Sequence, residues 1–245
     1  MKKIIESRII ENKKVTDDIF KIIVSANVDG EAGQFAQVRL PSNEFTLRRP
    51  FGIAATNNDQ LTMFYRIIGK GTQFLSECKA GTSINILAPL GNGFNIDGEK
   101  ILLVGGGLGL APLLPAAYKS KSADVIVGGK NIDEALLWKN EFKNLAENIF
   151  ITTDDGSYGH HGFATDIMPD ILKSNHYDRI LTCGPEIMMR NVAEIAKKNN
   201  IPCQVSLEKR MACGLGACLS CSTDTIHGRK KICKDGPIFN AEEVF

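Results

Sequence analysis

Short runs rich in β-branched and aromatic residues recur through the first 98 residues, and no long helical pattern occurs among them. Turn residues such as Asp29 and Gly30 separate the runs. This spacing is typical of an antiparallel β-barrel or sandwich. The runs that we expect to be strands are 19–25, 35–40, 51–56, 61–68 and 83–87, with one short helix near 72–79.

The pattern changes over residues 99–207, where apolar runs alternate with amphipathic stretches. The clearest amphipathic stretch is 185–198, in which Met188, Val192 and Ile195 share one helical face. Strands that alternate with helices indicate βαβ units and a doubly wound parallel sheet. The apolar runs that we expect to be its strands are 101–104, 125–128, 149–153, 179–183 and 203–207.

The last segment, residues 208–245, is too short to fold on hydrophobic burial alone, because units below about 40 residues usually need a metal or disulfide staple. With 43% hydrophobic residues, the rest of the chain can form sizeable cores. We therefore expect a multi-domain β plus α/β protein. Its parts would be an antiparallel β-barrel domain (1–98), a parallel-sheet domain (99–207) and a small C-terminal segment (208–245).

The net charge and the hydropathy pattern of the chain bear on its possible binding partners and its cellular location. The chain has 29 basic and 28 acidic residues, and this net charge of +1 does not favour nucleic acid or an anionic membrane. The N-terminus lacks the apolar core of a signal peptide. The uncharged stretch 101–118 contains four glycines and two prolines, which favour strand, loop and helix start over a membrane span. We expect a cytoplasmic, reducing location.

Four of the seven cysteines crowd into residues 213–233. The spacing of Cys213, Cys218 and Cys221, with Cys233 further on, matches the plant-type [2Fe–2S] pattern C-x4-C-x2-C…C. Glycine and alanine between the first two cysteines let backbone amides point at sulfur, which stabilises the extra negative charge of a reduced cluster. Zinc is the main alternative, although its cysteines usually come as two short pairs. Four unligated thiols are the other alternative.

A glycine-rich turn follows the first strand of the predicted parallel sheet. The turn contains Gly105, Gly106, Gly107 and Gly109, which would let a dinucleotide pyrophosphate approach backbone amides at the start of a helix. The pattern departs from the usual dinucleotide fingerprint at Leu110, where a third glycine is expected, and no carboxylate ends the second strand. A glycine-rich turn without a ligand remains the alternative.

Cys183 ends the fourth predicted strand and is followed by Gly184 and Pro185. In open α/β sheets, ligands bind beyond the carboxyl ends of the strands. The thiol of Cys183 is therefore a candidate catalytic group beside a nicotinamide ring. The alternative, which the spacing by itself favours, is a packed small residue before a helix.

Arg49, Pro50 and Phe51 lie on a predicted barrel strand, and Gly71 and Thr72 open the predicted short helix. An arginine can neutralise a pyrophosphate through paired hydrogen bonds, and a glycine–threonine turn at a helix start can bind a second phosphate. Each signal is weak by itself, because an exposed arginine on a barrel is commonly only solvated.

In this order, the motifs resemble those of the ferredoxin–NADP reductase superfamily. The segments 153–157, 206–221 and 232–239 are similar to those of a narrower family, the electron-transfer subunits of dihydroorotate dehydrogenase B. The resemblance covers essentially the whole chain, and the cysteine region is its specific part.

The resemblance implies three cofactors: FAD in the barrel, NAD at the parallel sheet and a [2Fe–2S] cluster at the C-terminus. Gly52 stands where the superfamily has a serine whose hydroxyl is expected near the reactive flavin nitrogen. The positions implied for FAD are Arg49, Pro50, Phe51, Gly52, Phe64, Tyr65, Arg66, Gly71 and Thr72. Those implied for NAD are Gly105, Gly106, Gly107, Gly109, Asp154 and Asp155, and the cluster ligands are Cys213, Cys218, Cys221 and Cys233.

Asp154 and Asp155 follow the third strand of the predicted sheet, where relatives face the adenosine ribose. Carboxylates accept hydrogen bonds from the ribose hydroxyls and repel a 2′-phosphate, so we expect NADH to be preferred over NADPH. The alternative is that both aspartates only hold the turn that follows them.

The chain shows no sign of the (β/α)8 barrel expected for dihydroorotate chemistry. The resemblance therefore implies a separate, FMN-containing dihydroorotate dehydrogenase catalytic subunit, in a heterotetramer of two copies of each chain. The complex would act in pyrimidine biosynthesis. The alternatives are a diaphorase-type subunit of a sulfite reductase or hydrogenase, and a flavin and iron–sulfur redox sensor.

Overall fold

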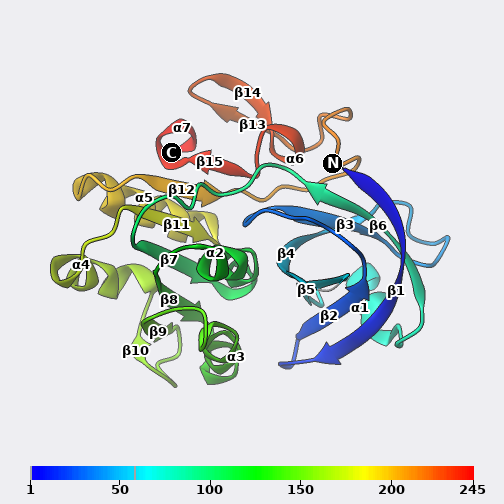
Figure 1. Cartoon of the computed structure of the whole chain (residues 1–245), viewed down its shortest axis with the longest axis horizontal. Coiled ribbons are helices and arrows are strands. Elements are labelled where there is room, and N and C mark those ends of the chain that lie inside the picture. The colour runs from blue at the N-terminus through cyan, green and yellow to red at the C-terminus, as the bar shows by residue number, and fades with distance from the viewer. Residues whose placement is uncertain (1, 58) are drawn as a thin grey trace.

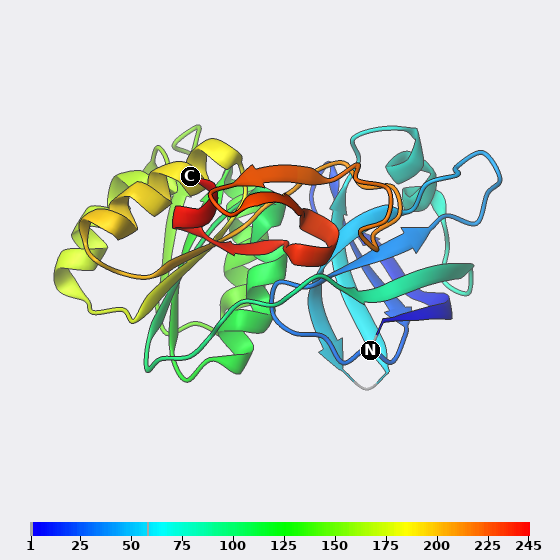
Figure 2. The same ribbon diagram turned by 90° about the horizontal axis from the view of Figure 1, so that it is seen from above.

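The computed structural model describes residues 2–57 and 59–245. A β-barrel stands beside an α/β domain, and the C-terminal segment lies across the top of both (Figure 1, Figure 2). This arrangement confirms the fold class that the sequence patterns predict.

Six antiparallel strands close the barrel in the order β1-β2-β5-β4-β3-β6. Alternating side chains such as Ile22, Val38 and Met63 fill its interior. The strands are β1 (Lys3–Lys14), β2 (Ile19–Ser25), β3 (Phe35–Arg39), β4 (Arg49–Asn57), β5 (Gln60–Arg66) and β6 (Ser83–Leu90), and the helix α1 (Lys70–Glu77) lies between the last two.

β1 is the barrel strand that the sequence patterns did not predict. Of its twelve residues, Ser7 and Ile9 are buried and the others are exposed or half-buried. Its register against β2 shifts between Ile9 and Glu11. A strand that buries so few side chains lacks the apolar alternation by which strands are predicted.

The second domain is a seven-stranded sheet in the order β10-β9-β8-β7-β11-β12-β15. All neighbouring strands are parallel except β12 and β15, and the strand order reverses between β7 and β11. Its strands are β7 (Ile101–Gly106), β8 (Ala123–Gly129), β9 (Ile149–Thr153), β10 (His160–His161), β11 (Arg179–Cys183), β12 (Cys203–Ser206) and β15 (Ile238–Asn240).

Helical elements cover both faces of this sheet, as a doubly wound fold requires. The 3-10 turn η1 (Gly107–Leu113) and the helices α2 (Leu114–Lys119) and α3 (Ile132–Phe142) share one core with the sheet. Helices α4 (Ala164–Ser174) and α5 (Glu186–Lys198) share the core on the other face. No helix in the described part of the chain combines the length and the apolar character needed to cross a membrane.

The C-terminal segment contacts both domains. It forms the hairpin β13 (Ser222–Thr225) and β14 (Gly228–Lys231), the short helices α6 (Ile232–Asp235) and α7 (Ala241–Val244), and β15, which extends the sheet. Cys221 and Cys233 are buried in one cluster with Phe35 and Leu87 of the barrel. The division of the chain after residues 98 and 207 stays a prediction.

The barrel and the sheet also share a continuous apolar core. One buried cluster contains Ile19, Ala54 and Phe64 of the barrel together with Leu114 and Trp138 of the second domain. The domains are thus held together by hydrophobic packing, and their relative position is fixed by side-chain shape.

Asp124 on β8 is a fully buried carboxylate. It accepts hydrogen bonds from the Tyr177 hydroxyl at 2.7 Å and from the Asn148 amide at 2.9 Å, and it pairs with Lys100 Nζ at 2.9 Å. Burial by itself raises the pKa of Asp124, but these partners outweigh burial and hold the pKa below its usual value.

We expect Asp124→Asn to lower the free energy of unfolding at pH 7 by about 3 kcal/mol, because it leaves the Lys100 ammonium without its buried partner. A carboxyl with a lowered folded-state pKa adds stability above its unfolded pKa and loses it as the pH falls through the folded pKa. The difference between wild type and variant should therefore shrink below about pH 4. Urea unfolding between pH 3 and pH 8 measures it, and a constant difference would contradict this assignment.

Candidate functional site

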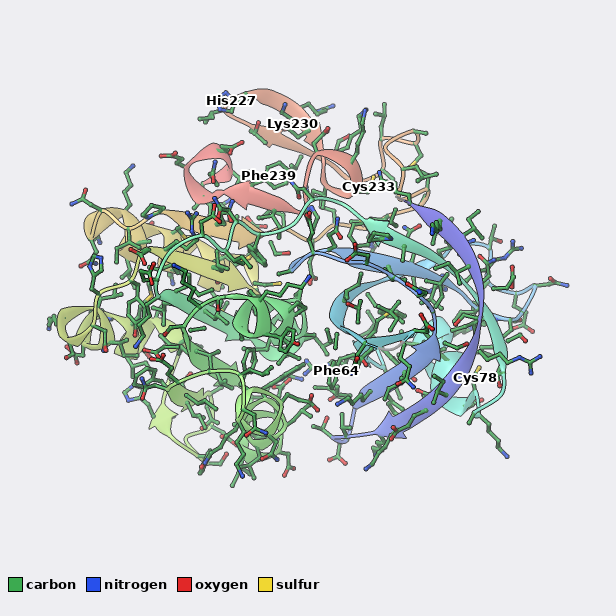
Figure 3. The ribbon with its side chains drawn as sticks, viewed as in Figure 1. Phe64, Cys78, His227, Lys230, Cys233 and Phe239 are labelled. Atoms are coloured by element: carbon green, nitrogen blue, oxygen red, sulfur yellow. The ribbon has the colours of Figure 1, made fainter. Side chains whose placement is uncertain are left out.

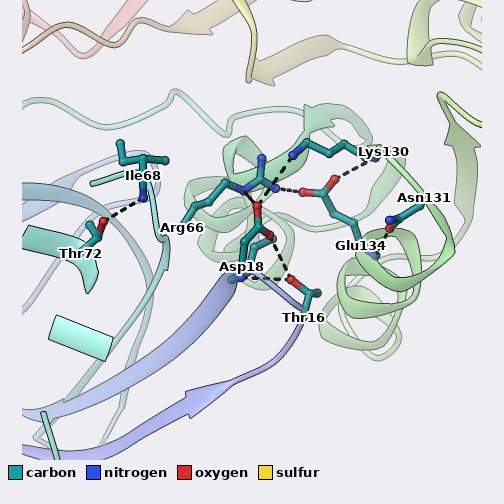
Figure 4. A network of polar contacts seen from close by, with 9 residues as sticks. Thr16, Asp18, Arg66, Ile68, Thr72, Lys130, Asn131 and Glu134 are labelled. Carbon is teal, nitrogen blue, oxygen red and sulfur yellow. Dashed lines mark hydrogen bonds and ion pairs between the residues drawn. The ribbon is translucent and has the colours of Figure 1, made fainter. Parts of the chain in front are cut away.

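Arg49 lies against the first turn of α1. A Cβ atom at Gly71 would stand 2.6 Å from Arg49 Nη2, so the guanidinium packs directly on the backbone there. The Thr72 hydroxyl accepts hydrogen bonds from the backbone N–H groups of Ile68 at 2.9 Å and Gly69 at 3.3 Å, and it holds the turn in shape (Figure 4). A guanidinium beside helix N-terminal amides favours a phosphate group.

Gly52 on β4 faces the turn η1 of the second domain. A Cβ atom at this position would lie 3.2 Å from Pro112 Cβ. The neighbouring Pro50 is exposed, and the half-buried ring of Phe51 lies 5.5 Å from the ring of Tyr65. The glycine therefore allows β4 and η1 to approach closely, which gives a physical reason for its presence where the resemblance leads us to expect serine.

Phe64 and Tyr65 point to opposite sides of β5, as successive strand residues do. The ring of Phe64 packs on Trp138 of α3 with 5.1 Å between centroids. Tyr65 lies in the barrel interior, and its hydroxyl donates a hydrogen bond to Asn12 at 2.8 Å. Both rings thus contact protein groups, and their roles toward FAD stay predictions.

Arg66 joins the barrel to the second domain through ion pairs (Figure 4). Its Nη2 contacts Glu134 of α3, and its Nε lies 3.1 Å from Asp18. Glu134 also accepts a hydrogen bond from the backbone N–H of Lys130 at 2.8 Å. A Cβ at Gly107 would lie 3.4 Å from Glu134 Oε1 and 4.0 Å from Arg66 Nη2, so this network borders the glycine-rich turn.

The glycines of that turn have different surroundings. A side chain at Gly105 would collide with Leu110, and one at Gly109 would collide with the backbone of Cys183. These two glycines therefore allow the chain to pack on itself, and Leu110 fills the space that Gly105 leaves. Gly107 has a left-handed φ of 55° and lies beside the polar network.

A cavity of about 340 Å³ opens beyond the carboxyl ends of β7 and β11, where the strand order reverses. Its lining includes Gly106, Gly109, Gly184 and Glu208. Such a switch point is the usual ligand position in this class of sheet. Cys183 lies behind it with a fully buried side chain, and burial raises the pKa of its thiol. A role for Cys183 at a nicotinamide ring stays a prediction.

Asp154 and Asp155 differ in their hydrogen bonding. The Asp155 carboxylate accepts hydrogen bonds from the N–H of Ser157 at 3.0 Å and from its hydroxyl at 2.6 Å, and these bonds lower the pKa of Asp155. Within the described residues, the Asp154 carboxylate has no hydrogen-bond donor; burial and the charges of Glu134 and Asp155 raise its pKa. Asp155 thus holds the turn, and Asp154 is the one available to a ribose.

Cys221 and Cys233 are buried in one cluster, and Cys221 Sγ accepts a hydrogen bond from the Cys233 N–H at 3.4 Å. Cys218 lowers the pKa of the Cys213 thiol, while burial, Cys221 and Cys213 raise that of Cys233, so the four thiols lie near one another. Among the described residues, no three ligands gather closely enough to hold a single metal ion. Four neighbouring thiols fit a cluster of two irons, because each iron takes two thiolates.

The backbone around Cys213 favours its thiolate form. Burial raises the pKa of this thiol, but N–H groups of Leu215, Cys218 and Ala217 outweigh burial and lower it to about 6. The Leu215 N–H donates to the sulfur at 3.3 Å. Amides aimed at sulfur are what an iron–sulfur cluster needs, since they stabilise negative charge on its ligands.

Comparison with known proteins decides the family. Residues 208–245 match the family model of the iron–sulfur cluster binding domain of dihydroorotate dehydrogenase B. The dihydroorotate dehydrogenase B (NAD(+)) electron transfer subunit of Clostridium acetobutylicum is 38% identical over 97% of this chain and 95% of its own length. The probable electron transfer subunit of the same enzyme in Methanocaldococcus jannaschii is 36% identical over 100% of this chain and 92% of its own.

The chain belongs to the family of dihydroorotate dehydrogenase B electron transfer subunits. Among solved structures, that of an NADH-dependent reduced ferredoxin-NADP oxidoreductase, studied for flavin-based electron bifurcation, is similar with a TM-score of 0.88. It is 31% identical over 98% of this chain and 89% of its own. A ferredoxin NADP+ reductase from Neisseria gonorrhoeae shares the fold, with a TM-score of 0.67 and 17% identity over 80% of this chain and 91% of its own.

Two residues of this electron transfer subunit were not singled out from the sequence. Glu208 lines the cavity at the switch point, and its place two residues after the last parallel strand was the available signal. Gln37 is a fully buried polar residue in β3. A polar residue within an apolar strand is the signal that could have identified it.

We expect Gly52→Ser to lower the melting temperature by about 4 °C, because the added atoms press on the Pro112 ring and overpacking of this kind costs about 1–3 kcal/mol. The control is Gly69→Ala, since a Cβ at Gly69 meets nothing within 4 Å. Thermal unfolding followed by circular dichroism measures both. Equal melting temperatures for the two variants would show that η1 yields to the serine.

Proposed function

We propose that this chain is the oxidoreductase subunit that passes electrons between NAD(H) and a dihydroorotate dehydrogenase catalytic subunit in pyrimidine biosynthesis. It would do so through FAD held by the barrel and a [2Fe–2S] cluster held by the C-terminal segment. The observation that carries the proposal is that segment, whose four cysteines have the plant-type spacing and lie within the family match. When bound, FAD exchanges a hydride with NAD(H) and single electrons with the cluster.

The FAD pyrophosphate would bind between Arg49 and the first turn of α1. The guanidinium supplies positive charge, Gly71 lets it approach the backbone, and Thr72 keeps the turn in place. These groups neutralise and orient an anion without movement of the barrel. The remaining positions assigned to FAD by resemblance are Pro50, Phe51, Gly52, Phe64, Tyr65 and Arg66.

NAD(H) would bind at the carboxyl edge of the parallel sheet. Gly106 and Gly107 border the approach, and the cavity beyond β7 and β11 has room for the nicotinamide end. The Asp154 carboxylate, which has no hydrogen-bond donor among the described residues, would accept hydrogen bonds from a ribose and repel a 2′-phosphate, which supports NAD over NADP.

The cluster would be held by Cys213 and Cys218 on one iron and by Cys221 and Cys233 on the other. The N–H groups that reach Cys213 and Cys221 support sulfur in its anionic form. Because Cys221 and Cys233 pack with the barrel residue Phe35, the cluster would lie beside the domain that holds the flavin.

A catalytic partner would dock on the C-terminal segment. Leu215, Leu219 and Ile226 are 49%, 60% and 70% exposed there, and these apolar side chains would be its contacts. The partner would carry FMN in a (β/α)8 barrel, and two copies of each chain would form a cytoplasmic heterotetramer.

A second function has support from structure. The similarity to the NADH-dependent reduced ferredoxin-NADP oxidoreductase, at 31% identity, favours a subunit that exchanges electrons with ferredoxin and NADP through a different partner. Purification of the native complex distinguishes the two functions, because the partner subunit would act on dihydroorotate in the first and on NADP in the second.

We expect the anaerobically purified chain to contain about two iron and two acid-labile sulfide per molecule. Cys218→Ser should lose most of both, because it removes one of the four thiolates that would hold the cluster. The control is Cys78→Ser, since Cys78 lies at the far end of the barrel from Cys233 (Figure 3). Stoichiometric zinc without sulfide in the wild type would overturn the cluster.

We expect the isolated chain to reduce ferricyanide with NADH and to leave orotate unchanged, because it shows no sign of the (β/α)8 barrel expected for dihydroorotate chemistry. Addition of the catalytic subunit should start orotate reduction. Absorbance at 340 nm follows both reactions. Orotate reduction by the pure single chain would contradict the division of labour between subunits.

A further inference from the structure

Gln37 on β3 is a buried polar side chain without a partner. Its exposed fraction is 0%, and neither its amide nitrogen nor its amide oxygen has a hydrogen-bond partner among the described residues. A buried amide without partners destabilises a fold, and replacement by an apolar group of the same shape would normally be favourable. We therefore expect a bound group with hydrogen-bonding atoms beside Gln37.

Gln37 faces the C-terminal segment. Its neighbours Ala36 and Val38 point into the barrel interior, and successive strand residues point to opposite faces. Phe35, on the same face as Gln37, packs in the cluster that contains Cys221. The Gln37 side chain therefore leaves the barrel on the side where the cysteines lie.

The amide lies directly on the cysteine loop. A Cβ atom at Gly214 would stand 2.5 Å from Gln37 Oε1 and 3.0 Å from Gln37 Nε2. Gly214 follows Cys213 and has a left-handed φ of 69°, so the loop wraps closely over the amide at this point. The absence of a side chain at Gly214 is what admits Gln37.

We propose that the Gln37 side-chain amide donates a hydrogen bond to an inorganic sulfide of the [2Fe–2S] cluster and thereby raises the cluster's reduction potential. This inference rests on the proposed cluster site. A donor beside the cluster stabilises the negative charge that one added electron brings, and a water-poor environment strengthens the effect. Gln37 would act as a positioning and tuning residue that belongs to the barrel, whereas the Leu215 N–H comes from the loop itself.

The test is an anaerobic redox titration of the cluster by EPR in the full chain with its cofactors. Gln37→Met keeps the shape of the side chain and removes the donor. We expect a more negative potential, so that the ratio of reduced to oxidised cluster at a fixed solution potential falls about tenfold. Gln37→Asn keeps an amide but withdraws it by one methylene, and it should give a smaller shift of the same sign.

The matched control is Gln34→Met in the same domain. The Gln34 amide already accepts a hydrogen bond from the Glu31 N–H at 2.8 Å and donates one to the Gly91 carbonyl at 2.9 Å. Its replacement should lower the melting temperature and leave the cluster potential unchanged. A purely structural role for Gln37 would give the same pattern as this control.

The iron and sulfide contents of each variant show which proposal a negative result contradicts, the role of Gln37 or the cluster itself. An unchanged cluster potential in Gln37→Met, at full iron and sulfide, would overturn the role of Gln37 and leave the proposed function standing. A shift of the flavin potential alone would overturn it as well. Loss of the cluster from both Gln37 variants, but not from Gln34→Met, would support the contact. A wild type without sulfide would overturn the proposed function and this inference together.

Discussion

The close packing of the turn η1 between the barrel and the sheet is the contact on which the rest of the site depends. Pro112 of this turn lies against Gly52 of the barrel, and Gly109 lies against the backbone of Cys183. Because neither glycine can gain a side chain without displacing its neighbour, the carboxyl edge of the sheet is held at a fixed place beside β4. The groups proposed for FAD and for NAD thus come from different domains and still adjoin.

The C-terminal segment uses the same two domains as its support. Its strand β15 pairs with β12 of the sheet, while its buried cysteines pack with Phe35 and Leu87 of the barrel. A segment this short has little core of its own, so its cysteines are positioned largely by surfaces that it does not supply. The same dependence explains why a barrel residue, Gln37, reaches the cysteine loop.

Ion pairs and hydrogen bonds add to the packing between the barrel and the second domain. Arg66 of the barrel contacts Glu134 of α3, and this pair borders Gly107 (Figure 4). Asp155 takes its donors from Ser157, which leaves Asp154 without one among the described residues. The two adjacent aspartates therefore differ in hydrogen bonding because the turn satisfies only one of them, although both have the same side chain.

The amino-acid sequence was enough to predict an antiparallel barrel, a doubly wound parallel sheet, the cysteine spacing and the family, because these depend on local periodicity and on short motifs. It did not reveal β1, whose mostly exposed positions lack apolar alternation, or β15, whose three residues acquire meaning only beside β12. Three contacts became known only from the folded chain: Phe64 packs on Trp138, Gly52 lies against Pro112, and Gln37 lies against the cysteine loop. Each of these contacts joins residues far apart in the chain, and no pattern of neighbouring residues specifies which distant surface a side chain will meet.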